Sequence, residues 1–163
     1  MHHDEMRRRV VLLRHGESGW DGDPPSDHER VLTDHGRWEA ARIGEALVAA
    51  GWKPERVVCS TASRARETAE TAAPEATTSH HSSLYMGGLH AIAEAVGELD
   101  DGVGIVWVVG HNPSLSGAAS ALCGESVSLA TANAACLEVD ADSWEEALSL
   151  TGAFELRELL TPR

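Results

Sequence analysis

The sequence predicts an α/β fold, a three-layer α/β/α sandwich in which helices cover both faces of a mainly parallel central sheet. Apolar runs of strand length alternate along the chain with alanine-rich segments of helical length. The run at 103–109 is apolar, which is typical of a central parallel strand buried on both faces. The chain has 163 residues, of which 42% are hydrophobic, without repeats or shifts of composition, so we expect a single domain over residues 1–163.

The first strand is predicted at Arg9–Arg14, where four apolar residues end abruptly in a cation, an imidazole and a glycine. The polar residues before it, 1–8, are expected to form a flexible N-terminal segment. The loop predicted at Gly16–Arg30 is rich in Gly, Pro and Asp, and loops of this length often carry function.

A helix is predicted at Thr33–Ala50, because Thr33 can cap its first turn and Gly51 can end it. One side of this helix is apolar and is expected to face the core. The residues of that side are Trp38, Ala41, Ile43, Leu47 and Val48.

The remaining elements continue the alternation of strand and helix. Residues 75–83 are polar and allow a short edge strand, whereas Trp144–Ser149 suit a short helix or an irregular connecting segment. Ala153–Leu160 suit a helix and a strand equally well. The other predicted strands are Arg56–Ser60, Val103–Val109 and Ala134–Val139, and the other predicted helices are Thr61–Ala72, His90–Leu99 and Pro113–Leu122.

The net charge and the cysteines of the sequence indicate which binding partners and which cellular compartment suit the protein. A formal net charge of −13 argues against nucleic acid and anionic membranes as partners. No secretory signal or membrane-spanning run is recognisable in the sequence. The cysteines are odd in number and lack metal-ligand spacing, and Cys59 and Cys136 lie in apolar runs, as buried thiols would. These features suit a reducing cytoplasm.

Three predicted strands end in polar residues of the same kind. Arg14 ends the first strand and His15 follows it, Arg64 opens the helix after the second, and His111 follows the third. The carboxyl ends of parallel strands meet at one edge of a sheet, so these residues can converge there. Arginines, imidazoles and helix N-termini together describe an anion site, which a phosphate fits best. Each residue alone also has a structural explanation, and the prediction depends on the recurrence of the pattern.

Four ordered motifs carry a resemblance to a known family. The sequence resembles the histidine phosphatase superfamily, in the branch marked by an Arg-His-Gly motif and shared with phosphoglycerate mutases. Within this branch it resembles the small SixA-type phosphohistidine phosphatases. The resemblance implies a phosphoglycerate mutase-like fold and a phosphatase activity that needs no metal or other cofactor. The motifs are Arg14–Ser18, Arg30–Gly36, Cys59–Ala69 and Val109–Pro113, and the final Leu159–Arg163 resembles the SixA type.

The resemblance implies a role for each residue at the predicted anion site. His15 is the nucleophile, which takes up the phosphoryl group and passes it to water. Arg14, Arg64 and His111 neutralise the oxygens of the transferring group. The two arginines would also lower the pKa of His15, so that its reacting nitrogen stays unprotonated. The residues expected to bind the substrate are Gly16 and Asn112, through their backbone N–H groups, and Ser18.

The proton donor is open. Many members of the family use a glutamate in the middle of the chain, and residues 85–90 contain none. A leaving group that departs readily, such as the imidazole of a phosphoramidate, needs less help from an acid. The candidate donors are Glu17, Asp21 and Asp27.

The expected partner is a phosphorylated protein or a small phosphate ester. The interval between Arg64 and His111 must hold a helix and a strand, which leaves little chain for a lid and favours an open pocket. We therefore expect hydrolysis of phosphohistidine in a protein. The alternatives are a small-molecule phosphomonoesterase of the same mechanism and a non-catalytic phosphate-binding relative, and a mutase is less favoured. No metal site is expected at the histidines at 80, 81 and 90, which lack a matching carboxylate or cysteine pattern.

Overall fold

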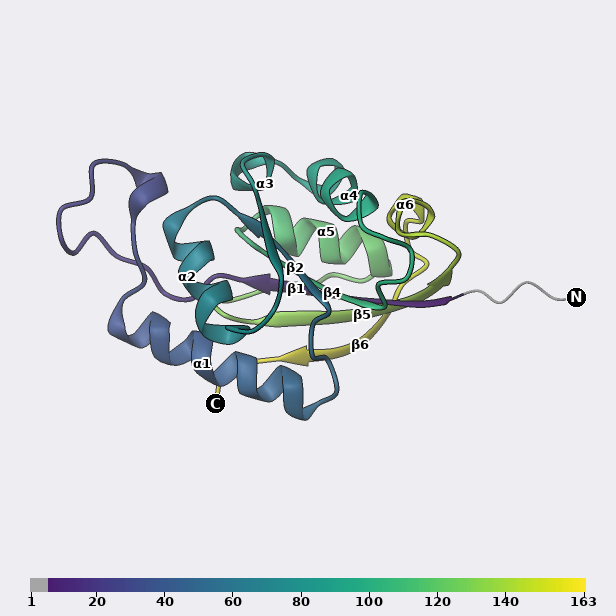
Figure 1. The fold of residues 1–163 in the computed structure, drawn as a ribbon, viewed down its shortest axis with the longest axis horizontal. Helices are drawn as coiled ribbons and strands as arrows, with labels where there is room; N and C mark the ends of the chain where they lie inside the picture. The colour runs from purple at the N-terminus through teal and green to yellow at the C-terminus, as the bar shows by residue number, and fades with distance from the viewer. Residues whose placement is uncertain (1–5) are drawn as a thin grey trace, which may run out of the picture.

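A six-stranded sheet in the order β3-β2-β4-β1-β5-β6 forms the centre of the fold (Figure 1). The structure, a computed structural model, describes residues 6–163. The strands are β1 (Met6–Arg14), β2 (Arg56–Ser60), β3 (Thr78–His81), β4 (Ile105–Gly110), β5 (Ala134–Ala141) and β6 (Glu155–Leu160).

The first four strands of the sheet run parallel, as the sequence predicts. β4 pairs in parallel with both β1 and β2, and β2 pairs in parallel with β3. β5 runs antiparallel to β1, and β6 antiparallel to β5. In register, Arg14 lies beside Gly110, and Cys59 lies beside Val109. The carboxyl ends of β1, β2 and β4 therefore share one edge of the sheet.

Helices cover both faces of this sheet, which confirms the three-layer prediction (Figure 1). One apolar cluster joins a face of the sheet to α1 and α2, and a second joins the other face to the remaining helices. The short 3-10 helix η1 lies in the long loop after β1. The helical bounds are η1 (Asp27–Glu29), α1 (Asp34–Ala49), α2 (Ser63–Ala72), α3 (Ser83–Met86), α4 (Leu89–Gly97), α5 (Ser114–Cys123) and α6 (Trp144–Ser149).

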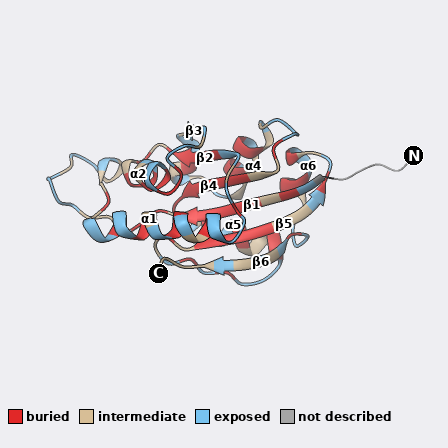
Figure 2. Ribbon diagram, turned by 60° about the horizontal axis from the view of Figure 1, so that its bottom comes forward, coloured by how far each residue is buried: buried red, intermediate tan, exposed pale blue. Residues whose placement is uncertain are grey.

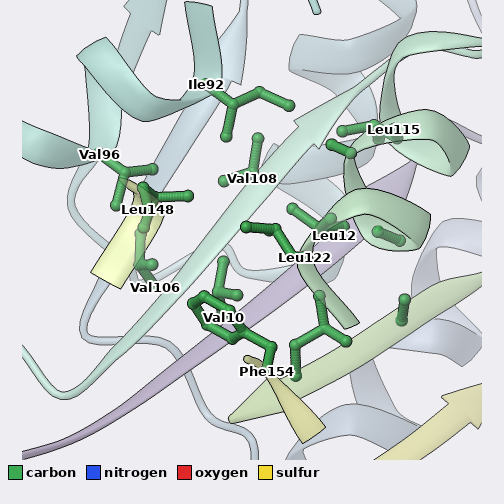
Figure 3. Packing of buried hydrophobic residues seen from close by; sticks show 14 of the residues in the cluster. Val10, Leu12, Ile92, Val96, Val106, Val108, Leu115, Leu122, Leu148 and Phe154 are labelled. Atoms are coloured by element: carbon green, nitrogen blue, oxygen red, sulfur yellow. The ribbon is translucent and has the colours of Figure 1, made fainter. Parts of the chain in front are cut away.

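β1 supplies both apolar clusters, because successive side chains of a strand point to opposite faces. Val10 and Leu12 belong to the cluster under α4, α5 and α6, whereas Val11 and Leu13 belong to the cluster under α1 and α2. All four side chains are fully buried. Figure 2 shows β1 and β4 buried at the centre of the sheet, and Figure 3 shows Val10 and Leu12 packed near Leu122. The strand that ends in Arg14 is therefore anchored on both sides.

The prediction of a flexible segment over residues 1–8 is wrong for residues 6–8, which belong to β1. Arg8 is only 1% exposed. Its guanidinium donates hydrogen bonds to four carbonyl oxygens near the amino end of β1, which compensates for burying the charge. These carbonyls belong to Asp101, Val103, Ala141 and Asp142. Residues 1–5 lie outside the described part of the chain.

The predicted apolar side of α1 is only partly right. Thr33 caps the helix as expected, accepting a hydrogen bond from the Gly36 N–H at 3.0 Å. Ile43 and Leu47 are buried, whereas Trp38 and Val48 are 45% and 50% exposed. The buried side instead includes glutamate and glycine positions, because α1 packs closely on α2 and reaches the turn after β1.

The ambiguous segments form ordered elements. Residues 75–83 contain the edge strand β3, Trp144–Ser149 form α6, and the end of the chain forms β6. The sequence prediction missed α3, a single turn flanked by polar residues and glycines.

All three cysteines are buried free thiols. None of the helices described within residues 6–163 has the length and apolar character needed to cross a membrane.

Candidate active site

Polar residues from the ends of β1, β2 and β4 meet at one edge of the sheet. His15 follows β1 and His111 follows β4, and their ring centroids lie 5.2 Å apart. Both histidines line a pocket of about 320 Å³. This pocket brings together all four residues that the sequence predicts around a phosphate. Its lining residues are Arg14, His15, Glu17, Ser18, Arg30, Arg64, His111, Asn112 and Thr131.

The imidazole of His15 is held in one tautomer. Its Nδ1 lies 2.7 Å from the carbonyl oxygen of Gly16, and because a carbonyl can only accept, Nδ1 carries the proton. The lone pair belongs to Nε2, which accepts a hydrogen bond from Arg64 Nε at 3.3 Å. Burial lowers the pKa of His15 to about 3, and the charges of Arg64 and Arg14 act in the same direction. At neutral pH the ring is therefore uncharged, with an unprotonated nitrogen at Nε2.

Arg64 reaches the pocket from the first turn of α2, and its side chain is only 9% exposed. Its Nη1 donates to the backbone carbonyl of Asp27 at 2.7 Å, and its Nη2 donates to Asp27 Oδ2 at 3.1 Å. A guanidinium carries five N–H groups. Asp27 takes one hydrogen from each of Nη1 and Nη2, so each of these nitrogens keeps a second hydrogen for another acceptor.

His111 and Arg14 each have one buried nitrogen without a hydrogen-bond partner among the described residues. His111 Nε2 lies 2.8 Å from Ser60 Oγ, whereas its Nδ1 has no such partner. Arg14 donates from Nη1 to the Leu129 carbonyl at 3.1 Å, whereas its Nε has no partner. Burial, followed by the charge of Arg64, lowers the pKa of His111 to about 4. Buried nitrogens are rarely left unpaired, and both belong to side chains that line the pocket.

The turn after β1 uses the N–H group of Gly16 for its own structure. This N–H donates to Thr68 Oγ1 at 3.0 Å, and the Thr68 hydroxyl donates to the Arg64 carbonyl at 2.8 Å. The Gly16 N–H is therefore already engaged in this structure, and its binding of substrate stays a prediction. Glycine is needed here for close packing, because a Cβ on Gly16 would lie 2.6 Å from the carbonyl oxygen of Gly36.

A buried carboxylate, Glu39 of α1, joins two sides of the pocket. Its Oε1 accepts from the Glu17 N–H at 2.8 Å, and its Oε2 accepts from the Thr131 hydroxyl at 3.0 Å. Burial lowers the pKa of Arg14, and the negative charge of Glu39 partly offsets this effect. Glu39 is one of the site residues that the sequence prediction missed, because its position in an amphipathic helix resembles an ordinary solvated one.

Asn112 and Ser18 line the pocket, and their side chains are also bound to protein groups. Asn112 Nδ2 donates to the Leu129 carbonyl at 2.7 Å, and its Oδ1 accepts from the Ser116 hydroxyl at 2.7 Å. Ser18 Oγ accepts from Arg30 Nη2 at 3.1 Å. Arg30 is a third arginine of the pocket, which the sequence prediction noted only as part of a motif before α1.

The three candidate proton donors lie in different surroundings. Glu17 lines the pocket, and its Oε1 accepts a hydrogen bond from a threonine hydroxyl at 2.8 Å. Asp21 is exposed and does not line the pocket. Asp27 does not line the pocket either, and both of its carboxylate oxygens are engaged. The Tyr85 hydroxyl, together with two arginines, holds the pKa of Asp27 well below its usual range.

Tyr85 reaches the site from α3, the helix that the sequence prediction missed. Its hydroxyl donates to Asp27 Oδ2 at 2.5 Å. Its ring packs edge-on against His111, with centroids 5.5 Å apart, and edge-on against His28 at 4.9 Å. The sequence offers no signal for this contact, because residues 85–90 are notable there only for the glutamate that they lack.

Comparisons with known proteins identify the family of the chain. The family model described as histidine phosphatase superfamily (branch 1) matches residues 10–84. A chloroplast protein of Arabidopsis thaliana, itself uncharacterised, is 32% identical, over 96% of this chain and 79% of that protein. The chain belongs to the histidine phosphatase superfamily.

Solved structures of this superfamily match almost the whole chain. A protein assigned as the phosphohistidine phosphatase SixA of Nakamurella multipartitia is 26% identical, with a TM-score of 0.88 over 98% of this chain and 99% of that chain. Another so assigned, from Agrobacterium tumefaciens, is 25% identical, with a TM-score of 0.78 over 96% of this chain and 99% of that chain. The phosphoglycerate mutase-like fold expected from the motifs is therefore confirmed.

Proposed function

We propose that this histidine phosphatase transfers a phosphoryl group to Nε2 of His15 and then to water, and that its substrate is phosphohistidine in a protein. The observation that carries the proposal is a neutral His15 whose unprotonated Nε2 lies beside Arg64, in a pocket that Arg14 and His111 also line. Phosphoryl transfer depends chiefly on positioning and on neutralisation of charge, which such a pocket supplies.

In the first step, a bond forms between Nε2 of His15 and phosphorus as the bond from phosphorus to the leaving group breaks. The ring gains positive charge, because Nδ1 keeps its proton, and the Gly16 carbonyl stabilises that proton. In the second step, water attacks phosphorus and the bond to Nε2 breaks. Both protons of the water stay with the released phosphate, which leaves as dihydrogen phosphate, and His15 returns to its neutral form.

Phosphohistidine suits this pocket because its leaving group needs little help from an acid. When the ring of the substrate is protonated at its second nitrogen, it departs as neutral imidazole with no further proton transfer. Asp27 has both carboxylate oxygens engaged and lies outside the pocket lining. The SixA proteins of similar structure, which are assigned as phosphohistidine phosphatases, support the same substrate class.

A second candidate is a small-molecule phosphomonoesterase of the same mechanism. Glu17 favours it, because this residue carries the one carboxylate among the pocket-lining side chains that the structure describes. An acid in that place could protonate an alcohol leaving group. A third candidate, a non-catalytic phosphate-binding relative, is less favoured, because both pocket histidines are present and His15 carries a lone pair at Nε2.

Substitution of His15 tests the mechanism. His15→Ala should abolish hydrolysis of p-nitrophenyl phosphate, whereas the matched control His90→Ala, at a side chain that is 92% exposed, should keep full activity. Undiminished turnover by His15→Ala would exclude His15 as the nucleophile. Quenching labelled substrate in alkaline denaturant should trap a phosphorylated wild-type protein, because the phosphorus–nitrogen bond survives alkali and not acid.

Competition between substrates tests the substrate class. Phosphohistidine protein and a panel of small phosphate esters are offered to the enzyme under the same conditions, and kcat/KM is measured for each. The proposal expects the phosphohistidine protein to have the higher kcat/KM. A much higher value for a small ester, lost in a Glu17→Gln variant, would support the phosphomonoesterase instead.

A further inference from the structure

The loop after β1 and the helix α3 meet at Asp27, beside the arginine of α2 that reaches His15. Three donors converge on the Asp27 carboxylate. Arg30 Nη1 donates to Oδ1 at 3.1 Å, whereas Arg64 Nη2 and the Tyr85 hydroxyl both donate to Oδ2, at 3.1 Å and 2.5 Å. Asp27 thus links three segments of the chain that are distant in sequence.

Asp27 holds Arg64 at two points. The Asp27 backbone carbonyl accepts from Nη1 and its carboxylate accepts from Nη2. One residue therefore binds both terminal nitrogens of the Arg64 guanidinium. The third nitrogen, Nε, is then directed at His15 Nε2, 3.3 Å away. Nη1 and Nη2 carry two hydrogens each, so this hold leaves a hydrogen on each for a phosphoryl oxygen.

The alternative role for Asp27, donation of a proton to the leaving group, fits the geometry poorly. Asp27 does not line the pocket, and its carboxylate accepts hydrogen bonds from two cationic side chains and a hydroxyl. All three contacts favour the ionised form, which has no proton to give. The side chain is 46% exposed, so water also solvates the charge.

We propose that Asp27 is a positioning residue: it fixes the guanidinium of Arg64 against His15 and the phosphoryl group, and Tyr85 in turn fixes Asp27. This inference rests on the proposed function, because it assigns a task to Arg64 in phosphoryl transfer. It extends that function to two residues, one in the long loop and one in α3, that touch neither the phosphorus nor the leaving group.

Removal and conservative replacement of Asp27 distinguish the two roles. In Asp27→Ala, Arg64 Nη2 loses its acceptor, and kcat/KM for p-nitrophenyl phosphate should fall by about tenfold to a hundredfold. In Asp27→Asn, the amide oxygen can still accept from Arg64, and most of the activity should return. If Asp27 is instead a proton donor, Asp27→Asn should be as impaired as Asp27→Ala, because neither an amide nor a methyl group can act as an acid.

Two further measurements separate positioning from a general loss of structure. The inhibition constant of inorganic phosphate should rise in Asp27→Ala, because a mobile Arg64 binds the anion less well. The fractional loss of activity should be equal for p-nitrophenyl and phenyl phosphate, whose leaving groups differ in their need for an acid. Tyr85→Phe should change the same quantities in the same direction by a smaller factor.

The matched control is Asp23→Asn, which removes an exposed carboxylate from the same loop. It should leave kcat/KM and phosphate inhibition unchanged, and thermal melting of every variant checks its folding. If Asp27→Asn is as impaired as Asp27→Ala, with a larger loss on phenyl phosphate, Asp27 is a proton donor and the proposal is wrong. Full activity of Asp27→Ala would also overturn it. Neither outcome overturns the proposed function, which is tested separately by the activity of His15→Ala and by the competition between phosphohistidine protein and small phosphate esters.

Discussion

Acidification from pH 7 to pH 5 should destabilise this protein through its buried pocket histidines. His15 titrates with a pKa of about 3 when folded, against an ordinary value of 6.5 in the unfolded chain. Between these values only the unfolded chain takes up the proton, so stability is full above pH 6.5 and falls as the pH is lowered. At pH 5 the loss is about 2 kcal/mol for His15, relative to pH 7. His111, with a pKa of about 4, acts in the same direction.

The loss at pH 5 depends only on the folded pKa being well below 5. Urea unfolding followed by tryptophan fluorescence at pH 7 and pH 5 measures it, with His15→Gln compared to wild type. The variant should lose about 2 kcal/mol less than the wild type between the two pH values. The control His90→Gln, at an exposed histidine, should behave as wild type. If His15→Gln shows the full wild-type dependence on pH, His15 is not a buried neutral group and the reasoning about its reactivity is refuted.

Three further substitutions test the packing that positions the site, each measured by urea unfolding at pH 7. Thr33→Ala removes the cap of α1 and should cost about 1 kcal/mol, and wild-type stability would exclude the cap. Leu122→Ala, at a fully buried side chain, should cost about 3 kcal/mol, and a cost below about 1 kcal/mol would contradict the packing. Gly36→Ala places a Cβ 2.0 Å from the Glu17 carbonyl oxygen, so stability and p-nitrophenyl phosphate turnover should both fall. Unchanged turnover in Gly36→Ala would show that the turn after β1 can shift without disturbing the active site.

Local patterns in the sequence are sufficient to predict the framework of the fold. The apolar runs of β1, β2 and β4 predict buried strands, and the polar residues that follow them predict where the strands end. Since parallel strands share one edge, the convergence of Arg14, His15, Arg64 and His111 on one pocket also follows from the sequence. Thr33 and Gly51 predict the bounds of α1 to within a residue or two.

Contacts between distant side chains could not be predicted in the same way. Asp27 meets Arg64 and Tyr85 only after the loop, α2 and α3 have packed together, and no periodicity in the sequence encodes that meeting. The burial of Glu39 has a similar cause, because α1 turns a polar residue toward the turn after β1. The sequence also could not reveal that the Gly16 N–H donates to Thr68, which lies 52 residues further along the chain.

Strand direction has a practical consequence for attaching this protein to a surface or to another molecule. β1 begins with Met6 at the edge of the sheet opposite the pocket and ends with Arg14 at the pocket. β6 runs in the same direction as β1, so the chain after Leu160 leaves the sheet on the pocket side. Figure 1 shows the arrows of β1 and β6 pointing toward the same side of the molecule. A tether attached ahead of β1 would therefore leave the pocket facing solution. A tether attached after β6 would place the surface or the attached molecule close to the pocket.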